Sequence, residues 1–331
     1  MRSLAILTAS LTTLSGASAL SKLEPPNGKI LFGVWFDGTG NTSSYSGGDT
    51  ASAVNSRLGF NVGSFQVWQE LPLKPPASGI APLLLPSGEV NMDMFDEKTD
   101  ASIFLTVYPD LSATITDDHI KALGTQCAAI IKGGRNVFIR LGPEMNGEWM
   151  QYGNKPTQFV ALWKRVYTIL NETAPQVAMV WSPNYNGVNG QNPFDPYWPG
   201  PEFVDWIGIS LYWKGFAVDW PWGVNKLAPS SYTAGVLTGT GGESAAGVSI
   251  YDQFAVKYGK PLVISETGAG FVFGAFNPST QVVAPVAPGP GRKDLQMESS
   301  TRTSSRNSPC SKWSSVLNAT SARTILTAIF V

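Results

Sequence analysis

The sequence predicts an α/β protein built as a (β/α)8 barrel that is incomplete at its eighth strand–helix unit. Short apolar runs rich in β-forming residues alternate with longer segments of helical period, which is typical of parallel strands joined by helices. The alternation continues over about 250 residues, the usual size of such a barrel. No glycine-rich phosphate turn follows the first run, so a doubly wound parallel sheet is only the alternative.

Seven apolar runs are the expected strands, and two segments between them are clear helices. The strands are 30–36, 62–68, 103–108, 137–141, 177–181, 204–213 and 261–265. The helix 117–132 follows Thr116, a good N-cap, and places Asp117 and Asp118 in its first turn, where negative charge meets the helix dipole. His119 is expected to be an exposed residue of that turn. The helix 156–171 begins with proline and carries one apolar stripe.

Three regions are expected along the chain. Residues 1–19 resemble a secretory signal peptide, because a basic residue and a short apolar run precede a small-residue cleavage site. Residues 20–277 hold the barrel. Residues 278–331 are rich in Pro, Ser and Thr and are expected to be disordered or to come from a mis-joined gene. Glycosylation sequons begin at Asn41, Asn171 and Asn318. We therefore expect a secreted, extracellular glycoprotein.

Composition excludes several function classes. The net charge is −1, so the chain has no basic field with which to hold nucleic acid or an anionic membrane. The chain has one histidine, His119, so a histidine-based triad has a single candidate base and a zinc site would need its other ligands from other residue types. Charged residues are 14% of the chain while aromatic residues are 11%. We expect a monomer that works without metal or cofactor.

Two glutamates at strand ends are the candidate catalytic pair. Glu144 follows the fourth strand and Glu266 follows the seventh, and the carboxyl ends of barrel strands meet at one rim. Strand alternation would place Arg140, Gly142 and Glu144 on one face. Glycoside hydrolysis needs one protonated and one ionised carboxyl group. Arg140 or a tyrosine could keep Glu266 ionised.

Further strand-end side chains are candidates for binding sugar. Flat aromatic faces stack on sugar rings without charge, although burial in the core is the default for any one of them. The candidates are Arg140, Trp149, Trp181, Asn184, Tyr212, Trp213 and Trp35.

The blocks around these residues resemble a known family. Arg140-x-x-x-Glu144-Met145-Asn146-Gly147-x-Trp149, then 181–184 (WSPN) and 265–268 (SETG), are similar to glycoside hydrolase family 26 and to related fungal secreted hydrolases of the retaining (β/α)8 clan. The resemblance implies a β-glycanase, most often a β-1,4-mannanase, with Glu144 as acid/base and Glu266 as nucleophile. It also implies that Tyr212 steadies the nucleophile.

One departure from the family pattern leaves the sugar open. Family mannanases have histidine immediately before the acid/base, and this chain has Pro143. The expected function is a secreted retaining endo-β-glycanase. β-1,4-Mannan is its first candidate substrate, and β-1,3-xylan and mixed-linkage β-glucan are the others. The alternative is a carbohydrate-binding protein with an inactive or truncated barrel.

Overall fold

The computed structural model of the protein describes most of the predicted barrel. The described residues are 21–26, 28–35, 50–76, 84–95, 99–185, 191–213, 215, 227–241, 248–269, 274–277, 282–285 and 324–326. The predicted signal peptide, the sequons at Asn41 and Asn318 and most of the predicted tail lie outside these ranges.

Eight parallel strands form one sheet in the order in which they occur along the chain. They are β1 (Gly33–Trp35), β2 (Ser64–Leu71), β3 (Ser102–Pro109), β4 (Val137–Leu141), β5 (Ala178–Trp181), β6 (Trp206–Trp213), β7 (Leu262–Ala269) and β10 (Thr324–Leu326). A doubly wound sheet would reverse its strand order, so that alternative is wrong. Among the described residues no pairing joins β1 to β10, and the predicted incomplete barrel is confirmed. The three-residue β10 beside β7 was not predicted.

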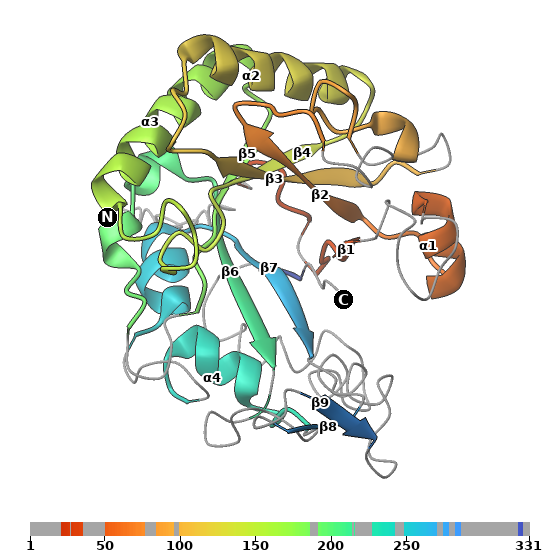
Figure 1. The fold of residues 1–331 in the computed structure, drawn as a ribbon, viewed down its shortest axis with the longest axis vertical. Coiled ribbons are helices and arrows are strands. Elements are labelled where there is room, and N and C mark those ends of the chain that lie inside the picture. Colours follow the sequence, from red (N-terminus) through yellow and green to blue (C-terminus); the bar gives the residue numbers. More distant parts are fainter. Residues whose placement is uncertain are drawn as a thin grey trace, which may run out of the picture.

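Helices cover the outside of the curved sheet (Figure 1). The helices are α1 (Ala51–Leu58), α2 (Asp117–Lys132), α3 (Pro156–Thr173), α4 (Tyr232–Thr238), a π-helix (Tyr251–Val256) and three 3-10 turns (Met92–Phe95, Asp195–Tyr197, Pro201–Phe203). A separate antiparallel pair, β8 (Gly274–Asn277) and β9 (Val282–Pro285), lies on both sides of the predicted domain boundary at 277. No helix within the described ranges is long and apolar enough to cross a membrane.

The helix α2 begins and ends where the sequence predicted. Thr116 Oγ1 accepts a hydrogen bond from the His119 backbone N–H at 3.3 Å, and His119 Nδ1 accepts one from the Thr116 N–H at 3.2 Å. This reciprocal pair satisfies two of the free donors at the start of the helix. His119 is therefore a capping residue.

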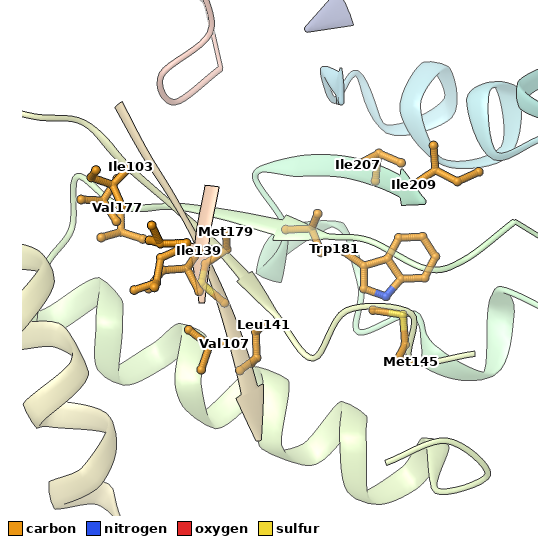
Figure 2. Close-up of a cluster of buried hydrophobic side chains, with 14 of the residues drawn as sticks. Ile103, Val107, Ile139, Leu141, Met145, Val177, Met179, Trp181, Ile207 and Ile209 are labelled. Carbon is orange, nitrogen blue, oxygen red and sulfur yellow. The ribbon is translucent and has the colours of Figure 1, made fainter. Parts of the chain in front are cut away.

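Two apolar clusters occupy the two faces of the sheet. The larger packs the sheet against the helices and includes Ile103, Ile139, Met179 and Trp181 (Figure 2). The smaller comes from alternate strand positions: Phe104, Phe138, Ala178, Val180, Trp206 and Val263. Strand side chains alternate between the two faces of the sheet, so the residue two positions further along each strand faces the same side as the residue of the smaller cluster. These residues form a second layer of side chains, nearer the carboxyl ends of the strands. That layer contains polar side chains, and it holds the candidate site.

Candidate active site

Glu266 lies on β7 and is held by side chains from two other strands of the sheet. Its Oε1 is paired with Nη1 of Arg140 from β4, and its Oε2 accepts a hydrogen bond of 2.8 Å from the Tyr212 hydroxyl on β6. The Glu266 side chain is 18% exposed. The sequence prediction that Arg140 or a tyrosine would keep this carboxyl ionised is consistent with both contacts.

The charges around Glu266 decide its protonation state. Burial alone would raise the pKa of Glu266, but the charge of Arg140 and hydrogen bonds from Arg140 and Tyr212 outweigh burial and hold the pKa below its ordinary value. The pKa of Tyr212 is raised, chiefly by burial and then by Glu266 and, more weakly, Glu144. Glu266 is thus an ionised carboxylate, and Tyr212 is a neutral hydrogen-bond donor.

Arg140 is completely buried and bonded only to protein groups. Besides Glu266 it donates from Nε to Ser182 Oγ at 3.0 Å and from Nη2 to Ser210 Oγ at 2.5 Å. Burial would lower the pKa of Arg140, but the charges of Glu266 and Glu144 raise it instead. The guanidinium is fully enclosed and is not among the residues that line the cavity beside Glu266, and its role in substrate binding stays a prediction. Arg140 is a positioning residue.

Gly208 on β6 makes room for this buried network. A Cβ atom at position 208 would lie 2.5 Å from Ser265 Oγ and 2.7 Å from Ser182 Cβ, closer than real Cβ contacts. The serines and this glycine keep the interior of the barrel open enough for the Arg140 side chain, which is one of the largest fully buried side chains.

Glu144 is positioned differently, by a sharp turn after β4. Both Gly142 (φ 54°) and Glu144 (φ 55°) have left-handed backbone conformations. The strand ends at Leu141, so the alternation that was expected to carry Arg140, Gly142 and Glu144 on one face does not continue. The Glu144 N–H donates to the Ser182 carbonyl oxygen at 2.9 Å, which ties the turn to the end of β5. A non-glycine residue held in this conformation is typical of a functional site.

The Glu144 carboxylate is half-buried and bonded to an exposed indole. Trp149 Nε1 donates to Glu144 Oε2 at 2.8 Å, and the Trp149 side chain is 53% exposed. The ring lies over Gly147, where a Cβ atom would come within 2.3 Å of it. Trp149 therefore offers a face at the rim beside the candidate acid, and its role in substrate binding stays a prediction.

A cavity of about 230 Å³ opens beside Glu266. Aromatic side chains dominate its lining, which consists of Trp35, Gln66, Val67, Trp68, Thr106, Tyr108, Tyr212 and Glu266. Trp35 and Tyr212 were sequence candidates, and their contact with sugar stays a prediction. Gln66, Thr106 and Tyr108 were missed. They occupy inward positions of β2 and β3, and counting alternate residues back from the rim could have found them.

Two other candidates, both tryptophans, are not among the residues that line this cavity. Trp181 is fully buried, donates from Nε1 to the Tyr197 carbonyl oxygen, and packs against Trp198 and Phe254. Trp213 is 4% exposed and packs edge-on against Tyr232. The structure thus places both Trp181 and Trp213 in the core, and their contact with sugar stays a prediction.

Asn184 joins two loops of the rim. Its side chain is 8% exposed, and its backbone N–H donates to Asn146 Oδ1 at 2.8 Å. Asn146 Nδ2 donates in return to the Asn184 carbonyl oxygen at 2.9 Å. Asn184 thus fixes the turn that carries Glu144, and the cavity beside Glu266 is lined by other residues.

The site contains no recognisable metal-binding cluster. Within the part of the chain that the structure describes, no three His, Cys, Asp or Glu side chains are grouped so that they could hold a metal ion. The chemistry that these side chains can supply is proton transfer and attack by a carboxylate.

Comparison with known proteins agrees with this geometry. The model of glycosyl hydrolase family 26 matches residues 114–229, a segment that includes Glu144 and Tyr212 and ends before Glu266. No curated protein sequence matches the chain significantly. Residues 114–229 thus carry the similarity to a known family at the level of sequence.

Solved structures share the fold at low sequence identity. A modular endo-β-1,4-mannanase from Cellulomonas fimi is 14% identical, with a TM-score of 0.51 over 91% of this chain and 65% of that chain. A Cellulomonas fimi endo-β-1,4-mannanase double mutant has a TM-score of 0.53 with the same coverage. The family 26 domain of an endo-β-mannanase/endo-β-glucanase from Prevotella bryantii is 14% identical, with a TM-score of 0.50 over 92% of this chain and 85% of that domain. The chain thus spans less than two thirds of the Cellulomonas protein.

Proposed function

We propose that the chain is a member of glycosyl hydrolase family 26, whose model matches residues 114–229, and that it is a retaining endo-β-glycanase acting on a neutral cell-wall polysaccharide. The observation that carries the proposal is Glu266, an ionised carboxylate held by Arg140 and Tyr212 at the edge of an aromatic cavity. A second carboxylate, Glu144, contributes to the electrostatic field at the same Tyr212 and Arg140. The two acids therefore act on one site.

The first step of the proposed reaction breaks the glycosidic bond. The Glu144 carboxyl group donates its proton to the glycosidic oxygen while the Glu266 carboxylate attacks the anomeric carbon. The bond between that carbon and the leaving oxygen breaks, and the sugar is left as an ester of Glu266. Tyr212 and Arg140 hold the attacking carboxylate in one orientation.

The second step releases the sugar. The Glu144 carboxylate, which has lost its proton, removes a proton from a water molecule, and the water oxygen attacks the anomeric carbon. The ester bond to Glu266 breaks, and both carboxyl groups return to their starting protonation states. Two displacements at one carbon give net retention of its configuration.

The lining of the cavity supports a neutral sugar. Among the described residues that line it, Glu266 is the one charged side chain, and four of the others are aromatic. Such walls stack on sugar rings and repel acidic ones. We propose β-1,4-mannan as the first substrate, with β-1,3-xylan and mixed-linkage β-glucan as alternatives because Pro143 replaces the histidine of family mannanases.

The proposal extends to where the protein works. The leader at residues 1–19 supports secretion, and Asn171 of the second sequon is exposed near the end of α3. We propose a secreted monomer with no nucleic-acid or membrane partner. The mass of the protein recovered from the culture medium, before and after deglycosylation, tests the cleavage and the glycan together.

A substrate panel tests the activity. The secreted protein is incubated with mannan, β-1,3-xylan, mixed-linkage glucan and cellulose, the product lengths are measured, and the anomer formed first is identified by NMR. We expect short oligosaccharides with retained configuration from at least one polymer. Inverted products would contradict double displacement, and absence of products with retained binding would establish the carbohydrate-binding alternative.

Two variants test the assigned residues. Glu144→Ala and Glu266→Ala should each lower kcat by about 10²–10⁴-fold or more, while binding of the same oligosaccharide changes little. Activity close to that of the wild type in either variant would remove that residue from the mechanism.

A further inference from the structure

Gln66 has a buried oxygen to which no described residue donates a hydrogen bond. This residue lies on β2, lines the cavity beside Glu266, and is 6% exposed. Its Nε2 donates to Thr106 Oγ1 at 3.0 Å, and its side chain is close enough to Glu266 to help lower the pKa of that carboxyl. Among the described residues, Oε1 of Gln66 has no hydrogen-bond partner. Buried side-chain acceptors without a donor are uncommon in folded proteins, so this atom calls for an explanation.

The charge of Glu266 fixes which end of the amide faces it. An ionised carboxylate can only accept hydrogen bonds, so the amide must turn its NH2 group toward Glu266. Arg140 and Tyr212 keep that carboxylate ionised. Reversing the amide would bring Gln66 Oε1 against a negative oxygen, whereas the Thr106 hydroxyl can either accept or donate and would bond to the amide in both orientations. The orientation with the unpartnered oxygen is thus the one that Glu266 requires.

We propose that Gln66 is a specificity-determining residue: its Oε1 accepts a hydrogen bond from a hydroxyl group of the sugar ring that lies against Glu266. The inference rests on the proposed hydrolase function and concerns the substrate of that same site. A free hydroxyl is the donor that a neutral sugar carries. A ring that lacks this hydroxyl, or carries an ester on it, would leave the Gln66 oxygen buried and unpaired, and such losses discriminate strongly between substrates.

A set of deoxygenated substrates tests the contact. The probes are the 2,4-dinitrophenyl β-glycosides of mannobiose and cellobiose, each with the ring that bears the dinitrophenyl group deoxygenated at C2, C3 or C6 in turn. For wild-type protein, one deoxygenation should lower kcat/KM by about 10- to 100-fold relative to its fully hydroxylated parent. In Gln66→Met, which keeps the volume but has no acceptor, the same deoxygenation should change kcat/KM by less than about threefold.

The comparison between substrates separates recognition from structural damage. Loss of the Gln66 bond to Thr106, and of its effect on the Glu266 carboxyl, lowers activity on every probe equally and cancels in the ratio. Gln69→Met is the matched control, because Gln69 is on the same strand and its amide pairs reciprocally with Gln126 at 2.9 and 2.8 Å, outside the cavity. This variant should retain the wild-type ratios.

The outcomes distinguish this inference from the proposed function. If wild-type protein hydrolyses a parent glycoside and Gln66→Met shows the same ratios as wild type at all three positions, the inference is wrong and the hydrolase function stands. If wild-type protein hydrolyses neither parent glycoside nor any polysaccharide of the panel, the proposed function fails and the inference fails with it.

Discussion

The two carboxylates of the site lie in contrasting surroundings. Glu266 lies within β7, directly after a bulge in the pairing of β7 with β6, and its two oxygens are bound by Arg140 and Tyr212, which come from β4 and β6. Glu144 is on a left-handed turn beyond the end of β4, and its side chain accepts a hydrogen bond from Trp149, an exposed ring. One acid is fixed by the barrel interior and the other by the rim.

This contrast matches the different demands of the two roles. A nucleophile must remain ionised and aligned with one carbon atom, which favours a rigid, charged neighbour. A group that first donates and later removes a proton must change its charge during each cycle, so a permanent ion pair would hinder it. The site therefore places its arginine beside Glu266, while the indole N–H of Trp149 bonds to Glu144.

Removing Arg140 should have the largest effect on the difference between the two carboxylates. Arg140→Met leaves Glu266 buried without its cation, and loss of one partner of a buried ion pair costs about 3–5 kcal/mol of unfolding free energy. Burial then acts on Glu266 without the opposing positive charge, so its pKa should rise. Urea denaturation and the pH profile of kcat/KM measure both effects. The acidic limb of the profile should move to higher pH.

The pH dependence of stability gives the sign of this effect. In the wild type the pKa of folded Glu266 is lowered, so its ionisation stabilises the fold above its ordinary pKa of 4.5 and this stabilisation is lost as pH falls through the lower, folded value. In Arg140→Met the raised pKa reverses the sign. The difference in unfolding free energy between the two proteins should therefore grow as pH rises past 4.5. A difference independent of pH would show that Arg140 acts through packing alone.

The sequence predicted the strands better than the depth of their side chains. Apolar runs located β2 to β7 because each run is continuous and bounded by polar segments. The same runs could not show that Trp181 and Trp213 face the core, because that depends on Trp198, Phe254 and Tyr232, which come from distant segments. The short α1 and α4 and the π-helix Tyr251–Val256 carry too few turns for a clear period.

The candidate site was predictable where the chemistry is local. Glu144 and Glu266 stand at the carboxyl ends of strands, and a charged residue after an apolar run is visible in the sequence. The left-handed turn at Gly142 and Glu144 depends on contacts with Phe159 and Ser182, which the order of residues does not contain. Gln66 was missed because its significance comes from an oxygen without a donor.

Removing one tyrosine hydroxyl near each carboxylate should have a smaller effect than removing Arg140, and it tests separately how each carboxylate is supported. Tyr212→Phe removes the hydrogen bond to Glu266 Oε2 and should lower kcat/KM by about 10- to 100-fold, because bonds to charged groups contribute about 1.5–3 kcal/mol. Tyr152→Phe removes a bond of 2.7 Å from a hydroxyl to the Pro143 carbonyl oxygen under the Glu144 turn. It should cost stability, with a smaller loss in kcat/KM. Equal losses of kcat/KM in the two variants would mean that both carboxylates are supported in the same way, which would contradict the proposed difference between them.

The exposed side of the site should show the smallest change. Trp149→Phe keeps an aromatic face but removes the N–H that bonds to Glu144 Oε2 at 2.8 Å. Since the ring is 53% exposed, the unfolding free energy should stay within about 0.5 kcal/mol of the wild type. The lost bond should lower kcat by about 3- to 10-fold with little change in KM, because it orients the proton donor rather than the sugar. A rise in KM with unchanged kcat would instead assign Trp149 to sugar stacking alone.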